Sequence, residues 1–343
     1  MTGAIKIDYD RFRPKLICFL CILSHLPVAA ALFQAIRQRS RECAMSETLS
    51  LGLVADIHHG AQVGTKLGPA ALPLLAAFND WANNLPLDLV VELGDRINNL
   101  DQDADRQLTQ DIAAAFGKLT LPRAHLLGNH DNHDLSRVAA EAAMQTGFHS
   151  WSRDLKGFHL VFWNADTCVK GKQAFVFDAA DLQWLEADLA STELPTIVFS
   201  HLPLDEGSMI GNFYFEKYFA GFAHYANAAG ARAVLEESGK VILCVSGHTH
   251  WNARNTIDGI HYITIHSLSE SFTTWPHPSG AYALLHVQDQ ITLEVFGRDP
   301  AYYRLPVRQP GRHWANLSRP FAPKPEVISP QMREYIAKAD AQQ

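Results

Sequence analysis

Basic residues are not in excess in this sequence, and cysteines are few. The 343 residues include 29 Lys and Arg against 36 Asp and Glu, which gives a formal net charge of −7. Binding to a nucleic-acid backbone favours a basic surface, so no nucleic-acid partner is expected. Of the five cysteines, only Cys168 and Cys244 lie beyond residue 45. Two cysteines in so long a stretch are no disulfide framework, so nothing in it requires an oxidising compartment.

The first 45 residues form an N-terminal extension that the sequence allows to be interpreted in three ways. The basic start and apolar middle of residues 11–33 are typical of a secretory signal or a membrane anchor. Polar residues and Pro27 interrupt the apolar run, which leaves it short of the roughly 18 residues that a spanning helix needs. The interpretation that we favour is that Met45 is the true start, because "MSETLSLGLVAD" leads directly into a strand. A start at Met45 predicts a cytoplasmic protein, whereas residues 11–33 would predict export or membrane anchoring.

From residue 49 onward, apolar strands alternate with helices. This alternation, followed by strands with little helix between them, predicts an α/β sandwich whose second sheet is completed by the C-terminal strands. The Pro-rich residues 305–343 are expected to form an irregular tail with a short helix near 330–338. The predicted strands are 49–56, 87–95, 123–131, 158–166, 195–201, 241–248, 260–266, 281–287 and 291–296, and the predicted helices are 68–85, 103–118, 178–190 and 228–238.

Five of the predicted strands end in a carboxylate, an amide or an imidazole. In an open α/β sheet, ligands bind in the crevice outside the carboxyl ends of the strands. In an extended chain, residues i and i+2 point the same way, so Asp56 and His58 are expected to reach one ion. The strand ends are "ADIH" (55–58), "GD" (94–95), "GNHD" (128–131), "SH" (200–201) and "GHTH" (247–250).

Together these side chains predict a metal site. Carboxylate, amide and imidazole ligands without thiolate suit Mn²⁺, Fe²⁺, Mg²⁺ or Zn²⁺. Seven ligands are too many for one ion and suit two, with positions left for water and substrate. The seven candidates are Asp56, His58, Asp95, Asn129, His201, His248 and His250.

The order of these five motifs resembles the calcineurin-like metallophosphoesterase superfamily over residues 49–250. The resemblance implies a four-layer αββα sandwich of two mixed sheets flanked by helices, and it places the catalytic domain at residues 48–304. No stable membrane insertion of that domain is expected. By this resemblance, Asp56, His58 and His250 bind one ion, Asp95 bridges both ions, and Asn129, His201 and His248 bind the other.

The resemblance also implies a reaction, which is hydrolysis of a phosphoester assisted by two divalent ions, Mn²⁺ or Fe²⁺ in preference to Mg²⁺ or Zn²⁺. His130 is implied to be catalytic, because it steadies phosphoryl oxygens or protonates the leaving group. From adjacency alone, Asp131 is expected to orient His130. Arg96, directly after Asp95, either faces a phosphate or pairs with a neighbouring residue.

Sequence motifs outside the ligands say less about the substrate. "FDAADLQWLEADL" (177–189) and "FSHLPL" (199–204) resemble Mn²⁺-dependent ADP-ribose/CDP-alcohol pyrophosphatases and cyclic-nucleotide phosphodiesterases of the superfamily. We therefore expect a small phosphorylated metabolite or nucleotide, cleaved at a phosphodiester or pyrophosphate bond. A phosphomonoesterase, a DNA-repair nuclease and a non-catalytic metal-bound scaffold remain alternatives. The sequence does not indicate an oligomeric state.

Overall fold

The computed structural model describes residues 47–307, 329–331, 334 and 337–338. The expectations for residues 1–45 and for most of the tail lie outside the described residues. The last strand of the two sheets ends at Pro306, two residues beyond residue 304, the expected end of the catalytic domain. Within the described part of the chain, no helix combines the length and the apolar character that crossing a membrane would require.

The first of two six-stranded sheets has the strand order β12-β11-β10-β1-β2-β3. Its β1, β2 and β3 are mutually parallel, whereas β10 runs antiparallel to β1 and continues into an antiparallel meander. The strands of this sheet are β1 (Leu49–Val54), β2 (Leu89–Glu92), β3 (Arg123–His125), β10 (Tyr282–Val287), β11 (Gln290–Phe296) and β12 (Ala301–Pro306).

The second sheet has the order β4-β5-β6-β7-β9-β8. Its four central strands are parallel, and an antiparallel strand closes each edge. The strands are β4 (Trp151–Leu155), β5 (Phe158–Phe162), β6 (Thr196–Phe199), β7 (Val241–Ser246), β8 (Ala253–Ile257) and β9 (Ile260–Thr264).

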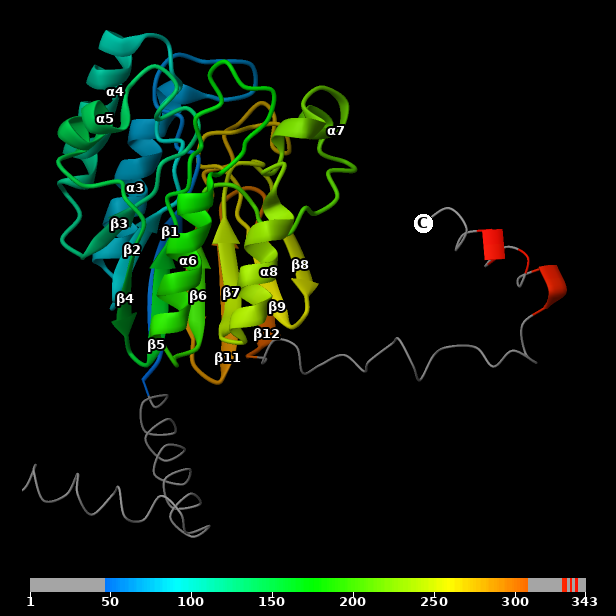
Figure 1. Cartoon of the computed structure of the whole chain (residues 1–343). Helices are drawn as coiled ribbons and strands as arrows, with labels where there is room; N and C mark the ends of the chain where they lie inside the picture. The colour runs from blue at the N-terminus through cyan, green and yellow to red at the C-terminus, as the bar shows by residue number, and fades with distance from the viewer. Residues whose placement is uncertain (1–46, 308–328, 332–333, 335–336, 339–343) are drawn as a thin grey trace, which may run out of the picture.

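Helices cover the outer faces of both sheets, so the four-layer sandwich expected from the sequence is confirmed (Figure 1). One set packs on β1–β3 and the other on β5–β7. The first set is α3 (Ala71–Asn83), α4 (Gln102–Phe116) and α5 (Arg137–Met144), and the second is α6 (Ala179–Ser191) and α8 (Ala228–Ser238). Short helices in the connecting loops are η2 (Gly68–Ala70), α7 (Phe213–Lys217) and η3 (Ala220–Phe222).

The alternation of side chains along a strand explains why these layers form. Leu51 and Leu53 of β1 pack between the sheets with Leu160 of β5. Val54 points to the other face, where it packs with Leu75 of α3. All six residues of β1 are buried because both faces of a central strand are covered. The sequence of β1 therefore specifies a buried strand between two layers.

The sheet assignment of the C-terminal strands was wrong. Only β8 and β9 join the second sheet, whereas β10, β11 and β12 extend the first one beside β1. In β10, Leu285 lies opposite Leu51, and both point into the space between the sheets. The alternation of apolar and polar residues determines which face of a strand is buried, but it does not indicate which strand lies beside it.

The third predicted strand, 123–131, is also shorter than expected, since β3 ends at His125. The reason lies in its backbone amides. The Leu127 amide donates to the side chain of Asn164 (2.8 Å), and the Gly128 amide donates to the carboxylate of Asp131 (2.8 Å). Side-chain acceptors thus replace the strand ladder and turn residues 126–131 into a loop.

A buried histidine between β5 and α6 makes stability depend on pH. The His159 ring contacts Asp188 (2.9 Å) and Asp154 (2.7 Å). Its hydrogen bond to Asp188 raises the pKa of His159 above its ordinary value, burial opposes that rise, and Asp154 adds to it. A raised pKa contributes stability below the ordinary value of about 6.5, and this is lost as pH rises through the folded-state pKa.

We expect His159→Ala to lower the free energy of unfolding by about 1–3 kcal/mol near pH 6, because two carboxylates lose their partner. The deficit relative to the wild type should shrink as the pH rises above the ordinary histidine pKa and through the raised pKa of His159. Urea denaturation of both proteins across this pH range measures it. A deficit that stays constant with pH would contradict the ionic role of His159.

Candidate metal centre

Five loops, which follow β1, β2, β3, β6 and β7, bring the predicted ligands together at one end of the two sheets. The backbone is left-handed at several of them, with φ of 51° at Asp56, 48° at His58 and 54° at His250. Residues other than glycine rarely adopt this conformation, and it concentrates at functional sites. The expectation that Asp56 and His58 point the same way from an extended chain was therefore wrong, although both side chains do reach the same place.

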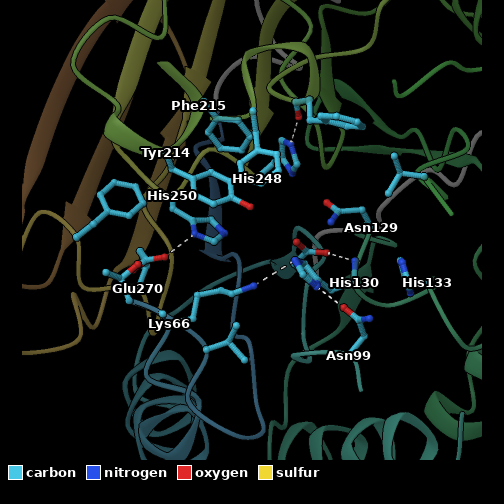
Figure 2. A pocket seen from close by; sticks show the side chains of 18 of the residues that line it. Lys66, Asn99, Asn129, His130, His133, Tyr214, Phe215, His248, His250 and Glu270 are labelled. Carbon is cyan, nitrogen blue, oxygen red and sulfur yellow. Dashed lines mark hydrogen bonds and ion pairs between the residues drawn. The ribbon is translucent and has the colours of Figure 1, made fainter. Parts of the chain in front are cut away.

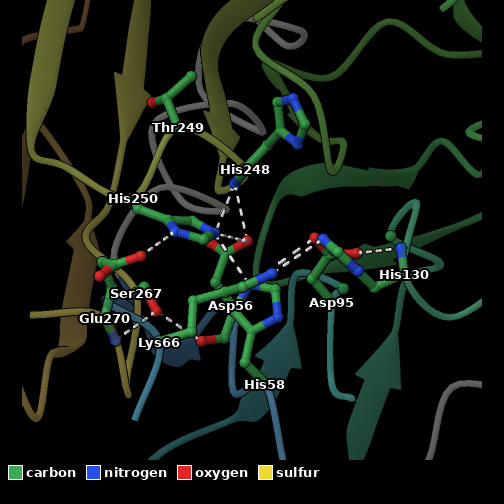
Figure 3. A network of polar contacts seen from close by, with 12 residues as sticks. Asp56, His58, Lys66, Asp95, His130, His248, Thr249, His250, Ser267 and Glu270 are labelled. Atoms are coloured by element: carbon green, nitrogen blue, oxygen red, sulfur yellow. Dashed lines mark hydrogen bonds and ion pairs between the residues drawn. The ribbon is translucent and has the colours of Figure 1, made fainter. Parts of the chain in front are cut away.

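Two glycines allow the loops to approach each other. A Cβ atom added at Gly128 would lie 2.0 Å from Oδ1 of Asp95, and one added at Gly247 would lie 2.5 Å from Oδ2 of Asp56. Neither distance is possible between real atoms, so the "GNHD" and "GHTH" motifs need glycine at their first position for steric reasons. The backbone amide of His248 then donates to the Asp56 carboxylate (2.9 and 3.1 Å; Figure 3).

The candidate ligand atoms form two groups that share Asp95. Within each group they lie within 4.8 Å of one another. Nε2 of His201 is 3.4 Å from the Asp95 carboxylate and 3.3 Å from Oδ1 of Asn129, so Asn129 joins the second group. The first group is Asp56, His58, Asp95 and His250, and the second is Asp95, His201 and His248.

Hydrogen bonds fix which ring nitrogen faces the centre in three of the four histidines: His201, His248 and His250. Nδ1 of His201 contacts the carbonyl of Leu93 (2.8 Å), and Nε2 of His248 contacts the carbonyl of Phe222 (2.7 Å). A ring nitrogen that faces a carbonyl must carry the proton, which leaves the other nitrogen with its lone pair. This is the second-shell arrangement that orients metal-ligating histidines.

In the first group of ligands, a carboxylate orients the ring of His250 in the same way. Nδ1 of His250 contacts Glu270 (3.0 Å), which turns Nε2 of His250 toward Nε2 of His58, 2.9 Å away. Two ring nitrogens that face each other beside the carboxylates of Asp56 and Asp95 are suited to share a cation. The donor set of carboxylate, amide and imidazole, without thiolate, fits a pair of divalent metal ions.

Burial and the neighbouring carboxylates together set the protonation of the four rings. Burial holds the pKa of His58 and of His248 well below the ordinary value, so both rings are neutral near pH 7. For His201 and His250, burial acts in the same direction, but Asp95 raises the pKa of His201 to about 9 and Asp56 raises that of His250 to about 9. A divalent cation competes with these protons, because only a neutral imidazole is a ligand.

His130 lies beside the two groups without belonging to either. Its Nδ1 contacts the side-chain oxygen of Asn99, and its Nε2 is 3.2 Å from Nζ of Lys66 (Figure 2). Burial lowers the pKa of His130 to about 3, and the charge of Lys66 acts in the same direction. The neutral ring therefore receives a hydrogen bond from Lys66, so that one of its nitrogens is oriented by Asn99 and the other faces an ammonium group.

Asp131 does not orient His130, so that expectation was wrong. Its carboxylate accepts hydrogen bonds from the backbone amides of Asp95 and Arg96 (both 2.9 Å) and of Gly128. Arg96 is fully buried, and its guanidinium pairs with Asp131 (3.2 Å) and Glu92 (2.8 Å). Arg96 therefore pairs with its neighbours and does not face a phosphate, and the pair fastens the Asp95 loop to the Asn129 loop.

The sequence analysis did not identify three residues of the centre: Lys66, Asn99 and Glu270. None of them belongs to a strand-end motif. Glu270 follows β9 in a segment whose Ser267 hydroxyl donates to the Asp56 carbonyl (2.6 Å). The only signal in the sequence was the acidic residue in the otherwise neutral "HSLSES" (266–271), which does not distinguish a buried carboxylate from a surface one.

The centre lies in the wall of a pocket of about 620 Å³. Asp95, Asn129, His248 and His250 line it together with His130, and Lys66 reaches it from the loop after β1. A volume of this size accommodates a small organic molecule. The arrangement can therefore hold a substrate directly against the two groups of ligands.

Solved structures with a similar fold include a dimetal phosphatase from Danio rerio, with a TM-score of 0.62 and 19% sequence identity over 76% of this chain and 99% of that chain. A purple acid phosphatase from seeds of yellow lupin (Lupinus luteus) gives a TM-score of 0.56 and 14% identity over 78% of this chain and 55% of that one. At such identities the likeness concerns the fold alone. A comparison with curated proteins found no significant match.

The two-sheet sandwich, with Asp, Asn and His side chains gathered at its strand ends, is a metallophosphoesterase fold. A sequence model of the calcineurin-like phosphoesterase family matches residues 49–252, more than half of the chain. The chain belongs to this family. The family resemblance noted in the five motifs is thereby confirmed, and so is the fold that it implied.

Proposed function

We propose that this protein hydrolyses phosphodiester or pyrophosphate bonds in small phosphorylated molecules and that it does so with two divalent metal ions. The observation that carries the proposal is the meeting of two groups of ligand atoms at one carboxylate, Asp95, in the wall of a pocket. Asp56, His58, Asp95 and His250 would hold one ion, and Asp95, Asn129, His201 and His248 would hold the other.

Two bound divalent ions would polarise the phosphoryl oxygens and lower the pKa of water between them. The rest of the chemistry belongs to side chains of this chain. Lys66 supplies a positive charge where the anionic phosphoryl group enters, and it donates to Nε2 of His130. The Lys66 ammonium group can pass a proton along this hydrogen bond to Nε2 of His130, the imidazolium can then donate it to the leaving oxygen, and water restores the proton on Lys66. Asn99 holds the ring in the orientation that this transfer needs.

The proposal is tested by removing bound metal with a chelator and restoring Mn²⁺, Fe²⁺, Mg²⁺ or Zn²⁺ one at a time. Bis-p-nitrophenyl phosphate, p-nitrophenyl phosphate, ADP-ribose, a CDP-alcohol and single-stranded DNA should be assayed in parallel. We expect the diester and pyrophosphate substrates to be hydrolysed, with Mn²⁺ or Fe²⁺ the best ions. Absence of hydrolysis with every ion would contradict the proposed function and leave the scaffold alternative.

A substitution of Glu270 tests whether this residue supports metal binding by the first group of ligands. Glu270→Gln weakens the acceptor that orients His250, so we expect Mn²⁺ affinity to fall by about 10- to 100-fold, as for other second-shell partners. Competition with a chelating dye measures the affinity. The same substitution at the exposed Glu294 of β11 is the control and should change nothing. Unchanged affinity in Glu270→Gln would remove Glu270 from the centre.

A further inference from the structure

One wall of the pocket beside the candidate metal centre is aromatic. Its residues come from three segments: the loop before α6, the stretch around α7 and η3, and the loop after β9. Figure 2 shows Tyr214 and Phe215 near His248, on the opposite side of the pocket from Asn99. The residues of this aromatic wall are Phe175, Phe213, Tyr214, Phe215, Phe219, Phe222 and Phe272.

Specific contacts hold the aromatic wall against the centre. The Asn212 side chain donates to the carbonyl of Thr249 in the "GHTH" loop (2.8 Å) and accepts from the amide of Phe215 (3.2 Å). The rings of Phe213 and Phe272 lie edge to face with centroids 5.2 Å apart, and those of Tyr214 and Phe219 are stacked at 4.7 Å. The wall is therefore a built surface whose position is tied to that of His248.

The aromatic wall itself offers few polar groups. Among the described residues that form the aromatic wall, only Tyr214 has a polar side-chain atom. Lys172, which lies near Phe175 in the sequence, pairs with Asp166 (2.6 Å), so its charge is compensated. A nucleobase could stack on this wall, but the donors and acceptors along its edge would find almost no partners there. A hydrocarbon needs none.

Apolar side chains continue from the wall onto the surface of the molecule. Phe213, Tyr214 and Phe219 are each about 40% exposed, and the neighbouring Ile210 is 79% exposed. Exposed apolar side chains that adjoin a pocket mark a surface that binds an apolar partner. A chain too long for the pocket can therefore follow the segment 210–219 outward and remain in apolar contact.

We propose that the natural substrate is a phosphodiester that carries a hydrocarbon chain on the substituent that stays with the phosphate, and that the aromatic wall binds this chain. The proposal rests on the proposed function, because the phosphoryl group must lie at the candidate metal centre for the chain to reach the wall. It narrows the expected substrate from nucleotides and small metabolites in general to those with an alkyl or acyl arm.

Methyl, butyl and octyl p-nitrophenyl phosphate test the proposal in the full-length protein with Mn²⁺, below the concentrations at which the octyl ester forms micelles. The leaving group is the same in all three, so kcat/KM reports the alkyl arm alone. Each buried methylene contributes up to about four-fold, so the butyl ester should exceed the methyl ester by roughly ten- to sixty-fold. Thymidine 5′-p-nitrophenyl phosphate represents the nucleotide alternative.

Two variants locate the effect. Phe213→Ala and Phe219→Ala should each reduce the ratio of butyl to methyl kcat/KM by about three-fold or more, because each removes part of the surface that the longer chain contacts. Tyr302→Ala is the control, since Tyr302 is an exposed tyrosine of β12 that does not line the pocket. A flat response to chain length would overturn the proposal, and so would a preference for the thymidine ester.

Binding of alkylphosphonates separates this proposal from the proposed function. Calorimetry should show octylphosphonate binding at least about ten-fold more tightly than methylphosphonate, and Phe219→Ala should remove most of the difference. If no ester is hydrolysed with any metal ion, the proposed function fails, and the ranking of the phosphonates alone then decides whether the wall binds a hydrocarbon. Equal affinities would overturn that inference.

Discussion

Asp95→Asn is expected to lower the metal-dependent phosphoesterase activity by at least about a thousand-fold, because the shared ligand loses its charge in both groups at once. The substitution is isosteric, and an amide oxygen can still accept the hydrogen bond that the His130 backbone amide donates to Oδ1 (2.8 Å). Folding should therefore be preserved. Activity on bis-p-nitrophenyl phosphate and the number of bound ions by elemental analysis are the two measurements.

Asp88→Asn provides a matched control. Asp88 also accepts a backbone hydrogen bond, from the amide of Ser50 (2.8 Å), but it lies at the start of β2, away from the centre. It should leave both activity and metal content unchanged. An Asp95→Asn protein that retains two ions and its activity would refute the assignment of Asp95 as the bridge.

His130→Ala is expected to lower kcat by about 100- to 10,000-fold, the usual contribution of a general acid or base. The metal content should stay at two ions, since His130 belongs to neither group of ligand atoms. This combination distinguishes a catalytic residue from a ligand. It also contrasts with Asp95→Asn, in which activity and metal content should fall together.

The same substitution at His277, which is exposed on the loop after β9, controls for the loss of an imidazole and should have no effect. If His130→Ala loses metal as well as activity, His130 is part of the metal centre. If it retains full kcat, the proton reaches the leaving group by another route, and Lys66 becomes the next residue to substitute.

The sequence indicates candidate ligands where Asp, Asn and His side chains follow apolar strands. The seven candidates lie in the loops after these strands, and the structure brings the other six side chains together with Asp95. It was also possible to predict the helix start at Asp178, whose carboxylate forms a capping box with Asp181 at the start of α6. Such local rules depend on residues close in the sequence, which a single chain displays.

The features that escaped prediction depend on contacts between distant segments. Glu270 and Lys66 meet the centre through loops that no periodic pattern describes, and a lone charged residue in a loop looks the same whether it is buried or solvated. Asp131 was assigned by adjacency to His130, although neighbours along a turn often point to different partners. The strands β10 and β11 were assigned to the wrong sheet because their alternation is compatible with either one, and β12 was not predicted.

Because the candidate ligands follow strands of two different sheets, the packing between the sheets affects the geometry of the candidate metal centre. Asp56, Asp95 and Asn129 follow strands of one sheet, whereas His201, His248 and His250 follow strands of the other. Side chains packed between the sheets, such as Phe199, therefore act as spacers that determine how far apart the two halves of the centre stand. Loss of volume in that interior would change the distance between the two groups of ligand atoms, so the packing between the sheets contributes to the geometry of the candidate centre.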